Sequence, residues 1–295
     1  MESTKKAPIL QTIRKKLHDY GELVMFSHTL FSLPFALIAL FLAADGFPEL
    51  RVFFWIMLAL FAGRNGANAL NRYVDAEIDQ KNPRTASRHI PAGKVRRQEA
   101  LYITLACYLL FVVAAAQINP LCLYLSPVAL ILFTLYSYTK RFTWLCHIIL
   151  GITCAGAPVG AWIAIKGLLD LPAIALGAVV TMWVAGFDII YGTQDIAFDT
   201  KAGLFSIPAR FGLRNSLWIA RGLHLLMWLT LLSLILMTQL SYIYFVGVVV
   251  SGVLLIMEHA FVDSDNRKKM NFVSYHLNQI ISMVLLFSAS MDIFF

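Results

Sequence analysis

Three oxygen-bearing side chains recur at helical spacing just after an apolar run. Asn71, Asp75 and Asp79 follow an i, i+4, i+8 pattern, which places them on one face of a helix over about 12 Å. Carboxylate and amide oxygens without histidine or cysteine suit a hard cation. Mg²⁺ in particular binds one or two carboxylates together with substrate phosphate oxygens. The spacing therefore predicts a divalent-cation site at this helix end.

A second stripe lies in the segment FDIIYGTQDIAFD. Its members are Asp188, Tyr191, Asp195 and Asp199, spaced i, i+3, i+7, i+11, and they share one helical face. Each stripe is followed by a polar segment containing Ile-Pro-Ala, at 90–92 and 207–209. We therefore predict two halves built alike, whose acidic ends meet. The simpler alternative is that such carboxylates are solvated helix ends or partners of nearby arginines, and this alternative suits Glu77 and Asp45 better.

Basic side chains surround both stripes and can carry the charge of a diphosphate through charge-assisted hydrogen bonds. They are Arg64, Arg72, Arg84, Arg88, Lys94, Lys140 and Arg141. We assign Arg64, Arg72, Arg84, Arg88 and Lys140 to diphosphate binding. No G-x-x-x-x-G-K-[ST] run occurs in the sequence, which argues against a nucleotide cradle.

The elements that must position these residues are membrane spans, because 59% of the 295 residues are hydrophobic and only 14% are charged. Soluble domains have about 45–50% apolar and 25% charged residues. Runs of about 20 apolar residues predict an all-α fold, a polytopic bundle of nine transmembrane helices with a cytoplasm-facing active site. The expected spans are Leu23–Ala44, Val52–Val74, 100–139 divided at Asn119-Pro120, Phe142–Ile165, Leu171–Tyr191, 222–257 divided near 238–242, and Met270–Met291.

The basic residues also predict the orientation of these spans. With the N-terminus inside, nineteen Lys and Arg residues fall in inner segments and only Arg51 and Lys166 in outer loops, as the positive-inside rule expects. We expect a basic cytoplasmic segment at 1–22 followed by one transmembrane domain at 23–295. The net charge of +7 thus reflects membrane topology and gives no reason to expect a nucleic-acid partner.

Other polar residues within the apolar spans receive simpler interpretations. Four cysteines lie inside spans without C-x-x-C spacing and are expected to pack. His28 and His147 are expected to be hydrogen-bonded core residues. Glu258, His259 and Asn278 are polar at depth and have no assigned role. The sequence sets neither the oligomeric state nor the length of any lipid substrate.

At this point the motifs resemble those of the UbiA family of intramembrane aromatic prenyltransferases. The first family motif, N-[DR]-x-x-D-x-x-x-D, is matched by residues 71–79, and the second, D-x-x-Y-x-x-x-D-x-x-x-D, by residues 188–199. A Y-x-x-x-K-R element is matched by residues 136–141. The resemblance covers nearly the whole chain, including the nine expected helices.

The resemblance implies transfer of a polyprenyl group from polyprenyl diphosphate to an aromatic hydroxy acid, in the biosynthesis of ubiquinone or menaquinone at the bacterial inner membrane. The cofactor would be Mg²⁺, held by Asn71, Asp75, Asp79, Asp195 and Asp199. Asp188, Tyr191, Lys140 and Arg141 would form the catalytic set: Asp188 and Tyr191 match the family's acceptor positions, and Lys140 and Arg141 match positions that face the diphosphate or the aromatic acid. The partners would be both substrates and the lipid bilayer.

Two acceptors remain open. The resemblance favours 4-hydroxybenzoate, but position 72 is Arg and residues 88–93 read RHIPAG, whereas the best-known ubiquinone enzymes have Asp and RPLPSG. Prenylation of 1,4-dihydroxy-6-naphthoate in futalosine-route menaquinone biosynthesis is therefore the alternative. A cation-coupled transporter fits less well, because transporters hold their charges near the membrane midplane. A CDP-alcohol phosphotransferase would need a D-G-x-x-A-R element, which the sequence lacks.

Overall fold

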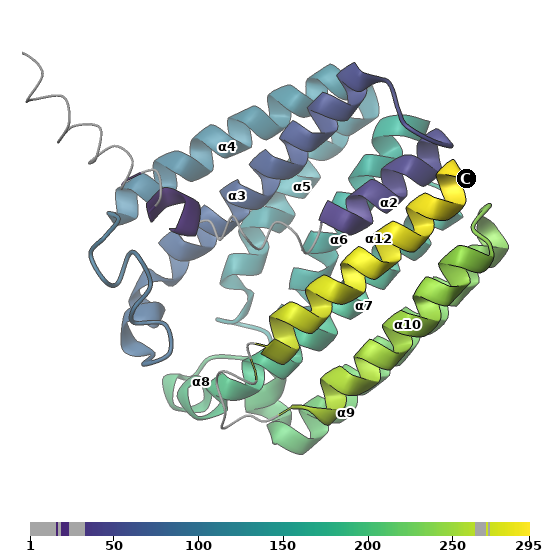
Figure 1. Ribbon diagram of the computed structural model, residues 1–295. Helices are drawn as coiled ribbons and strands as arrows, with labels where there is room; N and C mark the ends of the chain where they lie inside the picture. The colour runs from purple at the N-terminus through teal and green to yellow at the C-terminus, as the bar shows by residue number, and fades with distance from the viewer. Residues whose placement is uncertain (1–15, 17–18, 24–32, 263–269, 271) are drawn as a thin grey trace, which may run out of the picture.

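The computed structural model describes residues 16, 19–23, 33–262, 270 and 272–295, and all regular elements in these ranges are helical. Figure 1 shows elongated helices packed side by side, with α8 and the α3–α4 loop at the opposite end of the bundle from the C-terminus. The helices are α2 (Leu33–Ala44), α3 (Leu50–Lys81), α4 (Arg97–Ile118), α5 (Pro120–Thr139), α6 (Cys146–Lys166), α7 (Leu171–Gly192), α8 (Ile196–Ala202), α9 (Ile207–Met237), α10 (Tyr242–Ala260) and α12 (Asn278–Phe294). A 3₁₀ turn, η2 (Thr193–Asp195), precedes α8, and a π-helical turn, η3 (Phe272–Leu277), precedes α12.

Within the described ranges, eight helices are long and apolar enough to cross a membrane, and α2 is a shorter apolar helix. The all-helical membrane fold is therefore confirmed, and the count of nine is approximate. The first expected span includes residues 24–32, and the basic segment 1–22 includes residues 1–15, 17 and 18; these lie outside the described residues, as does His28. The large side chains exposed on the outer helices, such as Leu236, Tyr124 and Ile256, suit contact with lipid rather than water.

The two predicted breaks inside long apolar runs are confirmed. The side chain of Asn119 accepts a hydrogen bond from Cys122 N at 2.8 Å, and Pro120 occupies the first turn of α5, a combination that starts a helix. Helix α9 ends at Met237 and α10 begins at Tyr242. Several boundaries differ: α6 begins at Cys146 rather than Phe142, because a turn joins α5 to α6, and the helices α3 and α9 extend past their apolar spans, to Lys81 and back to Ile207 respectively.

The second stripe departs from its expected geometry. Helix α7 ends at Gly192, and the chain continues through η2 before α8 begins at Ile196. Asp188 and Tyr191 therefore lie on α7, Asp195 on the 3₁₀ turn and Asp199 on α8. The prediction of one continuous helical face was wrong here, because the tighter 3₁₀ turn changes the angular spacing between residues.

Small residues allow the central helices to approach closely. A Cβ atom added to Gly151 of α6 would lie 2.3 Å from the carbonyl oxygen of Thr181 on α7. A Cβ atom on Gly66 of α3 would lie 2.8 Å from the ring of Tyr108 on α4. Backbone approach at small residues is a main source of helix association in membranes, and these contacts help to position α3, which carries the first stripe, and α7, which carries the start of the second.

The polar residues left without a role form a buried group that joins four helices. The indole Nε1 of Trp183 on α7 donates to Asn278 Oδ1 on α12 at 2.6 Å. Asn278 Nδ2 donates to Glu258 Oε1 on α10 at 2.8 Å, and Glu258 Oε2 lies 3.5 Å from His224 Nδ1 on α9. His224 Nδ1 also lies 3.0 Å from His259 Nε2. These hydrogen bonds make polar side chains tolerable within the bundle.

Candidate active site

The first stripe lies at the end of α3, where Asp75 is surrounded by donors. Its carboxylate lies 2.6 Å from Lys140 Nζ and 3.0 Å from Arg141 Nη2, and it accepts a hydrogen bond from Asn71 Nδ2 at 3.1 Å. Only 3% of the Asp75 side chain is exposed. The end of α5 thus supplies two positive charges to the first aspartate, so the Y-x-x-x-K-R element and the first motif form one site.

Asp79 lies one turn further along α3 and has its own basic partners. Arg88 Nη1 donates to both carboxylate oxygens, at 2.7 and 2.8 Å, and Arg72 Nη1 lies 3.9 Å from Oδ2. Arg88 belongs to the loop between α3 and α4, which folds back over the helix end; the hydroxyl of Thr85 donates to the carbonyl of Asp79 at 3.1 Å. The loop after the first motif is therefore part of the site.

The same loop reaches the second motif. Arg84 Nε donates to Asp195 Oδ1 at 2.8 Å, Arg84 Nη2 donates to Asp195 Oδ2, and Arg84 Nη1 donates to the hydroxyl of Tyr191 at 2.7 Å. Asn82 Nδ2 adds a hydrogen bond to Asp195 Oδ1 at 3.0 Å. Burial by itself would lower the pKa of Arg84, but the hydrogen bonds to Asp195 and the nearby Tyr191 raise it above its ordinary value. A charged guanidinium thus joins the two motifs.

The remaining two carboxylates of the second motif have different partners. Asp188 Oδ2 lies 2.7 Å from Nδ1 of His147 on α6. Asp199 Oδ2 accepts a hydrogen bond from the hydroxyl of Ser206 at 3.0 Å, and Ser206 also caps α9 by accepting from Ala209 N at 3.2 Å. Asp188 therefore faces a histidine rather than the basic loop.

The structure gathers most of the expected site residues at one end of the bundle. Arg64 lies deeper in the bundle than the others, about 10 Å from Asn71 along the axis of α3 at about 1.5 Å per residue. Cys154 and Tyr136 are near its guanidinium. Tyr136 of the Y-x-x-x-K-R element donates to the carbonyl of Ala67 at 3.0 Å. This contact ties α5 to α3 beneath the aspartates.

Sequence reasoning missed several neighbours of the site, among them Ser206. Asn82 contacts Asp195, His147 contacts Asp188, and Tyr275 of η3 packs edge-on against Tyr191 with ring centroids 5.1 Å apart. Asn82 directly follows the first stripe and could have been included with it. His147 and Tyr275 come from helices α6 and η3, which no local spacing relates to the motifs.

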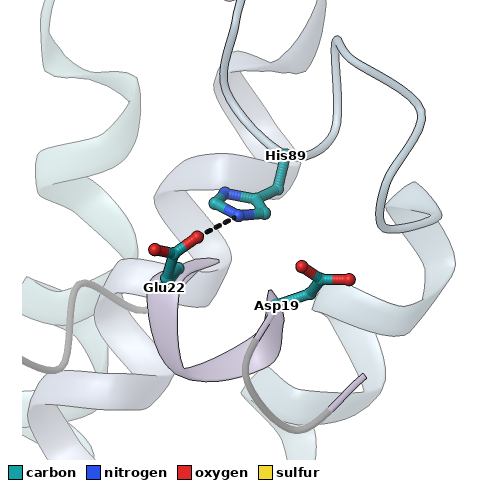
Figure 2. Close-up of side chains that lie close together, drawn as sticks. All are labelled: Asp19, Glu22 and His89. Atoms are coloured by element: carbon teal, nitrogen blue, oxygen red, sulfur yellow. Dashed lines mark hydrogen bonds and ion pairs between the residues drawn. The ribbon is translucent and has the colours of Figure 1, made fainter. Parts of the chain in front are cut away.

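A separate group of possible ligands lies beside the α3–α4 loop. Asp19, Glu22 and His89 place one ligand atom each within 4.8 Å of one another, and Figure 2 shows His89 from the loop facing Glu22 of the preceding helical segment. His89 Nε2 lies 3.0 Å from Glu22 Oε2. This polar contact is enough to explain the grouping, and it holds residues 19–23 against the loop that carries Arg84 and Arg88.

The donor set of the two motifs fits a hard divalent cation and an anionic substrate. Asp75, Asp79 and Asp195 present carboxylate oxygens that are mostly buried, and each carboxylate is compensated by arginine or lysine. No sulfur or imidazole ligand contacts these three among the described residues, so the chemistry matches Mg²⁺ better than a transition metal. The same basic side chains have the geometry to bind phosphate oxygens.

The fold and the site together define a polytopic membrane protein with a buried array of carboxylates and basic residues at one end of its helical bundle. The model of the UbiA prenyltransferase family matches residues 32–280. The chain belongs to this family, and it is a prenyltransferase.

Known relatives agree over most of the chain. It is 32% identical over 243 residues to a 4-hydroxybenzoate octaprenyltransferase from Marinomonas sp. (strain MWYL1), covering 80% of this chain and 84% of that protein. It is 28% identical over 286 residues to an enzyme of the same description from Vibrio vulnificus (strain CMCP6), covering 96% of each.

Solved structures of similar fold include a UbiA homolog from Aeropyrum pernix K1, with a TM-score of 0.81 and 30% identity, covering 90% of this chain and 98% of that one. A UbiA homolog from Archaeoglobus fulgidus, described as bound to DMAPP and Mg²⁺, matches with a TM-score of 0.68 at 20% identity, covering 93% and 99%.

Proposed function

We propose that this enzyme transfers a polyprenyl group from polyprenyl diphosphate to an aromatic hydroxy acid, with 4-hydroxybenzoate as the favoured acceptor, in respiratory quinone biosynthesis. The observation that carries the proposal is a set of paired opposite charges at the end of the bundle where the two motifs lie. Asp75, Asp79 and Asp195 each form an ion pair with arginine or lysine there. Such an array can take divalent cations on its carboxylates and a diphosphate on its basic groups. Relatives described as 4-hydroxybenzoate octaprenyltransferases support the acceptor.

On this proposal, the metal residues are Asn71, Asp75, Asp79, Asp195 and Asp199, and the cofactor is Mg²⁺. The structure of the Archaeoglobus fulgidus homolog described with DMAPP and Mg²⁺ supports both the cation and the prenyl diphosphate. When bound, the cation supplies positive charge that stabilises the leaving diphosphate. The diphosphate residues are Arg64, Arg72, Arg84, Arg88 and Lys140.

The chain's own residues supply the rest of the chemistry. Lys140, Arg84 and Arg88 are hydrogen-bond donors that are paired with carboxylates here and can bind diphosphate oxygens instead. Their charge favours departure of the diphosphate most strongly where water is excluded. The allylic carbon then reacts with the ring carbon ortho to the acceptor hydroxyl. Asp188 or Tyr191 would draw the proton of that hydroxyl, and Arg141 would bind the carboxylate of the acceptor.

A second acceptor is favoured by one specific observation. Position 72 is Arg and residues 88–93 read RHIPAG, whereas the best-known ubiquinone enzymes have Asp and RPLPSG at these positions. On this basis 1,4-dihydroxy-6-naphthoate is the alternative substrate. The protein would lie in the bacterial inner membrane with both motifs facing the cytoplasm, from which a water-soluble acid would enter.

An assay of the purified protein in nanodiscs tests the proposal. Mg²⁺, an octaprenyl diphosphate and a panel of aromatic acids would be supplied, and prenylated products would be identified by mass spectrometry. We expect product with 4-hydroxybenzoate or 1,4-dihydroxy-6-naphthoate, none with benzoate, and loss of product when EDTA is added. Product formation that ignores EDTA would contradict the metal assignment, and the absence of product with every hydroxy acid would contradict the proposed function.

A further inference from the structure

The first helical turn of α6 contributes a histidine to the second motif. His147 Nδ1 lies 2.7 Å from Asp188 Oδ2, and the side chains are 7% and 29% exposed. The two residues lie on neighbouring helices, 41 positions apart in sequence. A short contact of this kind between a nearly buried imidazole and a carboxylate restricts the rotamer of both side chains.

The position of the imidazole ring is also fixed from the other side. A Cβ atom added to Gly192 would lie 3.1 Å from His147 Cε1, so the glycine at the end of α7 makes room for the ring. His147 Nε2 is buried and makes no hydrogen bond within the part of the chain that the structure describes. The ring is therefore held by its contact with Asp188 and by its position against Gly192.

Asp188 keeps one oxygen for another purpose. Oδ2 is taken by His147, whereas Oδ1 makes no hydrogen bond or ion pair with any of the residues that the structure describes. One turn further along α7, Tyr191 carries the guanidinium of Arg84 over its ring at 4.8 Å and packs edge-on against Tyr275. Asp188 thus lies one helical turn before a tyrosine that belongs to a pair of packed aromatic rings.

We propose that His147 is a positioning residue that holds Asp188 as the hydrogen-bond acceptor for the ring hydroxyl of the aromatic substrate, and that it thereby selects hydroxyl-bearing rings. This inference rests on the proposed prenyl transfer to an aromatic hydroxy acid. The Nδ1–H of His147 donates to Oδ2, which keeps the carboxylate in one orientation and leaves Oδ1 for the substrate. The arrangement uses the same physical device as other histidine–carboxylate pairs, in which one partner fixes the orientation of the other.

The reaction balances with these groups. As the ring carbon bonds to the allylic carbon, the allylic C–O bond breaks and its electron pair leaves with the diphosphate. The hydroxyl proton moves to Asp188 Oδ1 and the ring oxygen becomes a carbonyl. The prenylated ring carbon then loses its proton to the diphosphate, and Asp188 returns its proton to the oxygen, which restores the aromatic ring and the phenol.

Two variants of His147 separate positioning from simple packing. His147→Ala removes the donor, whereas His147→Asn keeps an N–H donor close to the position of Nδ1. We expect His147→Ala to raise the KM for 4-hydroxybenzoate, or to lower kcat, by on the order of 10-fold to 100-fold, with the KM for the prenyl diphosphate within about twofold of the wild type. His147→Asn should recover most of this loss.

Gly192→Ala gives an independent test, because it displaces the ring without removing it. It should lower turnover in the same acceptor-specific way. His224→Gln is the matched control: His224 is a similarly buried histidine that contacts His259 and the carbonyl of Trp183. Its loss should lower the melting temperature and leave the KM for the acceptor unchanged.

Selection for the hydroxyl group can be measured without turnover. Benzoate lacks the hydroxyl, so the ratio of its dissociation constant to that of 4-hydroxybenzoate, both from equilibrium binding, reports the contact with Asp188. We expect this ratio to fall about tenfold in His147→Ala, which corresponds to the loss of one hydrogen bond of about 1.4 kcal/mol. If wild-type enzyme transfers the prenyl group and His147→Ala keeps the same ratio and the same acceptor KM while only its melting temperature falls, the positioning role is overturned. Failure of the wild type with every acceptor would instead overturn the proposed function.

Discussion

Replacement of Arg84 tests whether the α3–α4 loop joins the two motifs. Arg84 donates two hydrogen bonds to Asp195 and one to Tyr191, and the two charged side chains are 17% and 13% exposed. Arg84→Ala leaves Asp195 with Asn82 as its remaining hydrogen-bond partner among the described residues. Removing one partner of a buried ion pair costs about 3–5 kcal/mol, and partial exposure of this pair lowers the expected cost to about 2–4 kcal/mol.

Most of this cost should appear as lost activity, because the site is assembled by the loop. A loss of about 2.7 kcal/mol in transition-state stabilisation lowers kcat/KM about a hundredfold, and we expect an effect of this order for the prenyl diphosphate. Arg84→Lys keeps the charge but can make only one of the three directed contacts, so it should recover about a tenth of the wild-type value. The assay is initial-rate kinetics in nanodiscs, together with thermal unfolding of the same samples.

Arg97 supplies the matched control. It follows the same loop and pairs with Glu77 at 3.0 Å, but the two side chains are 43% and 76% exposed. An exposed ion pair contributes about 0–1 kcal/mol, so Arg97→Ala should change kcat/KM by less than about fivefold. If Arg84→Ala and Arg97→Ala lost activity to the same extent, the bridge between the motifs would have no special importance and the reasoning would be refuted.

Three further predictions concern metal, packing and orientation. Asp75→Ala or Asp195→Ala should abolish turnover with little loss of folded protein; retention of more than about a tenth of the activity would contradict their assignment as metal ligands. Gly151→Ala should lower the melting temperature, because its Cβ would lie 2.3 Å from the carbonyl oxygen of Thr181 and overpacking costs about 1–3 kcal/mol. Gly156→Ala on the same helix is the control, because its Cβ meets nothing within 4 Å. Equal stability of the two variants would contradict the prediction. Residues 75–97 and 192–214 should face the cytoplasm, and the C-terminus should face outward. A cysteine at exposed Lys94 should therefore react with an impermeant thiol reagent only in inverted vesicles, and a cysteine at exposed Lys166 only in right-side-out vesicles. The reverse labelling would overturn the orientation.

The sequence alone was enough to predict the class of fold and to single out residues that the structure brings together in the candidate site. Membrane spans are encoded locally, because a helix must satisfy its backbone hydrogen bonds within one apolar segment. The breaks at Asn119-Pro120 and near residues 238–242 were recognised for the same reason, since caps and prolines act on adjacent residues. The i, i+4 spacing of Asp75 and Asp79 likewise describes a single regular helix, α3, and its geometry follows from the helical repeat.

Tertiary structure decided which charges meet. Asp75 contacts Lys140 and Arg141 across 65 and 66 sequence positions, and Asp195 contacts Arg84 across 111. No periodicity relates such residues, because their distance depends on how α3, α5 and α7 pack and on how the loop folds back. The 3₁₀ turn at Thr193–Asp195 also escaped the pattern, since residue spacing alone does not distinguish a short 3₁₀ turn from a continued α-helix. His147 was interpreted from sequence as a hydrogen-bonded core residue, but only the close approach of α6 to α7, which Gly192 permits, placed it against Asp188.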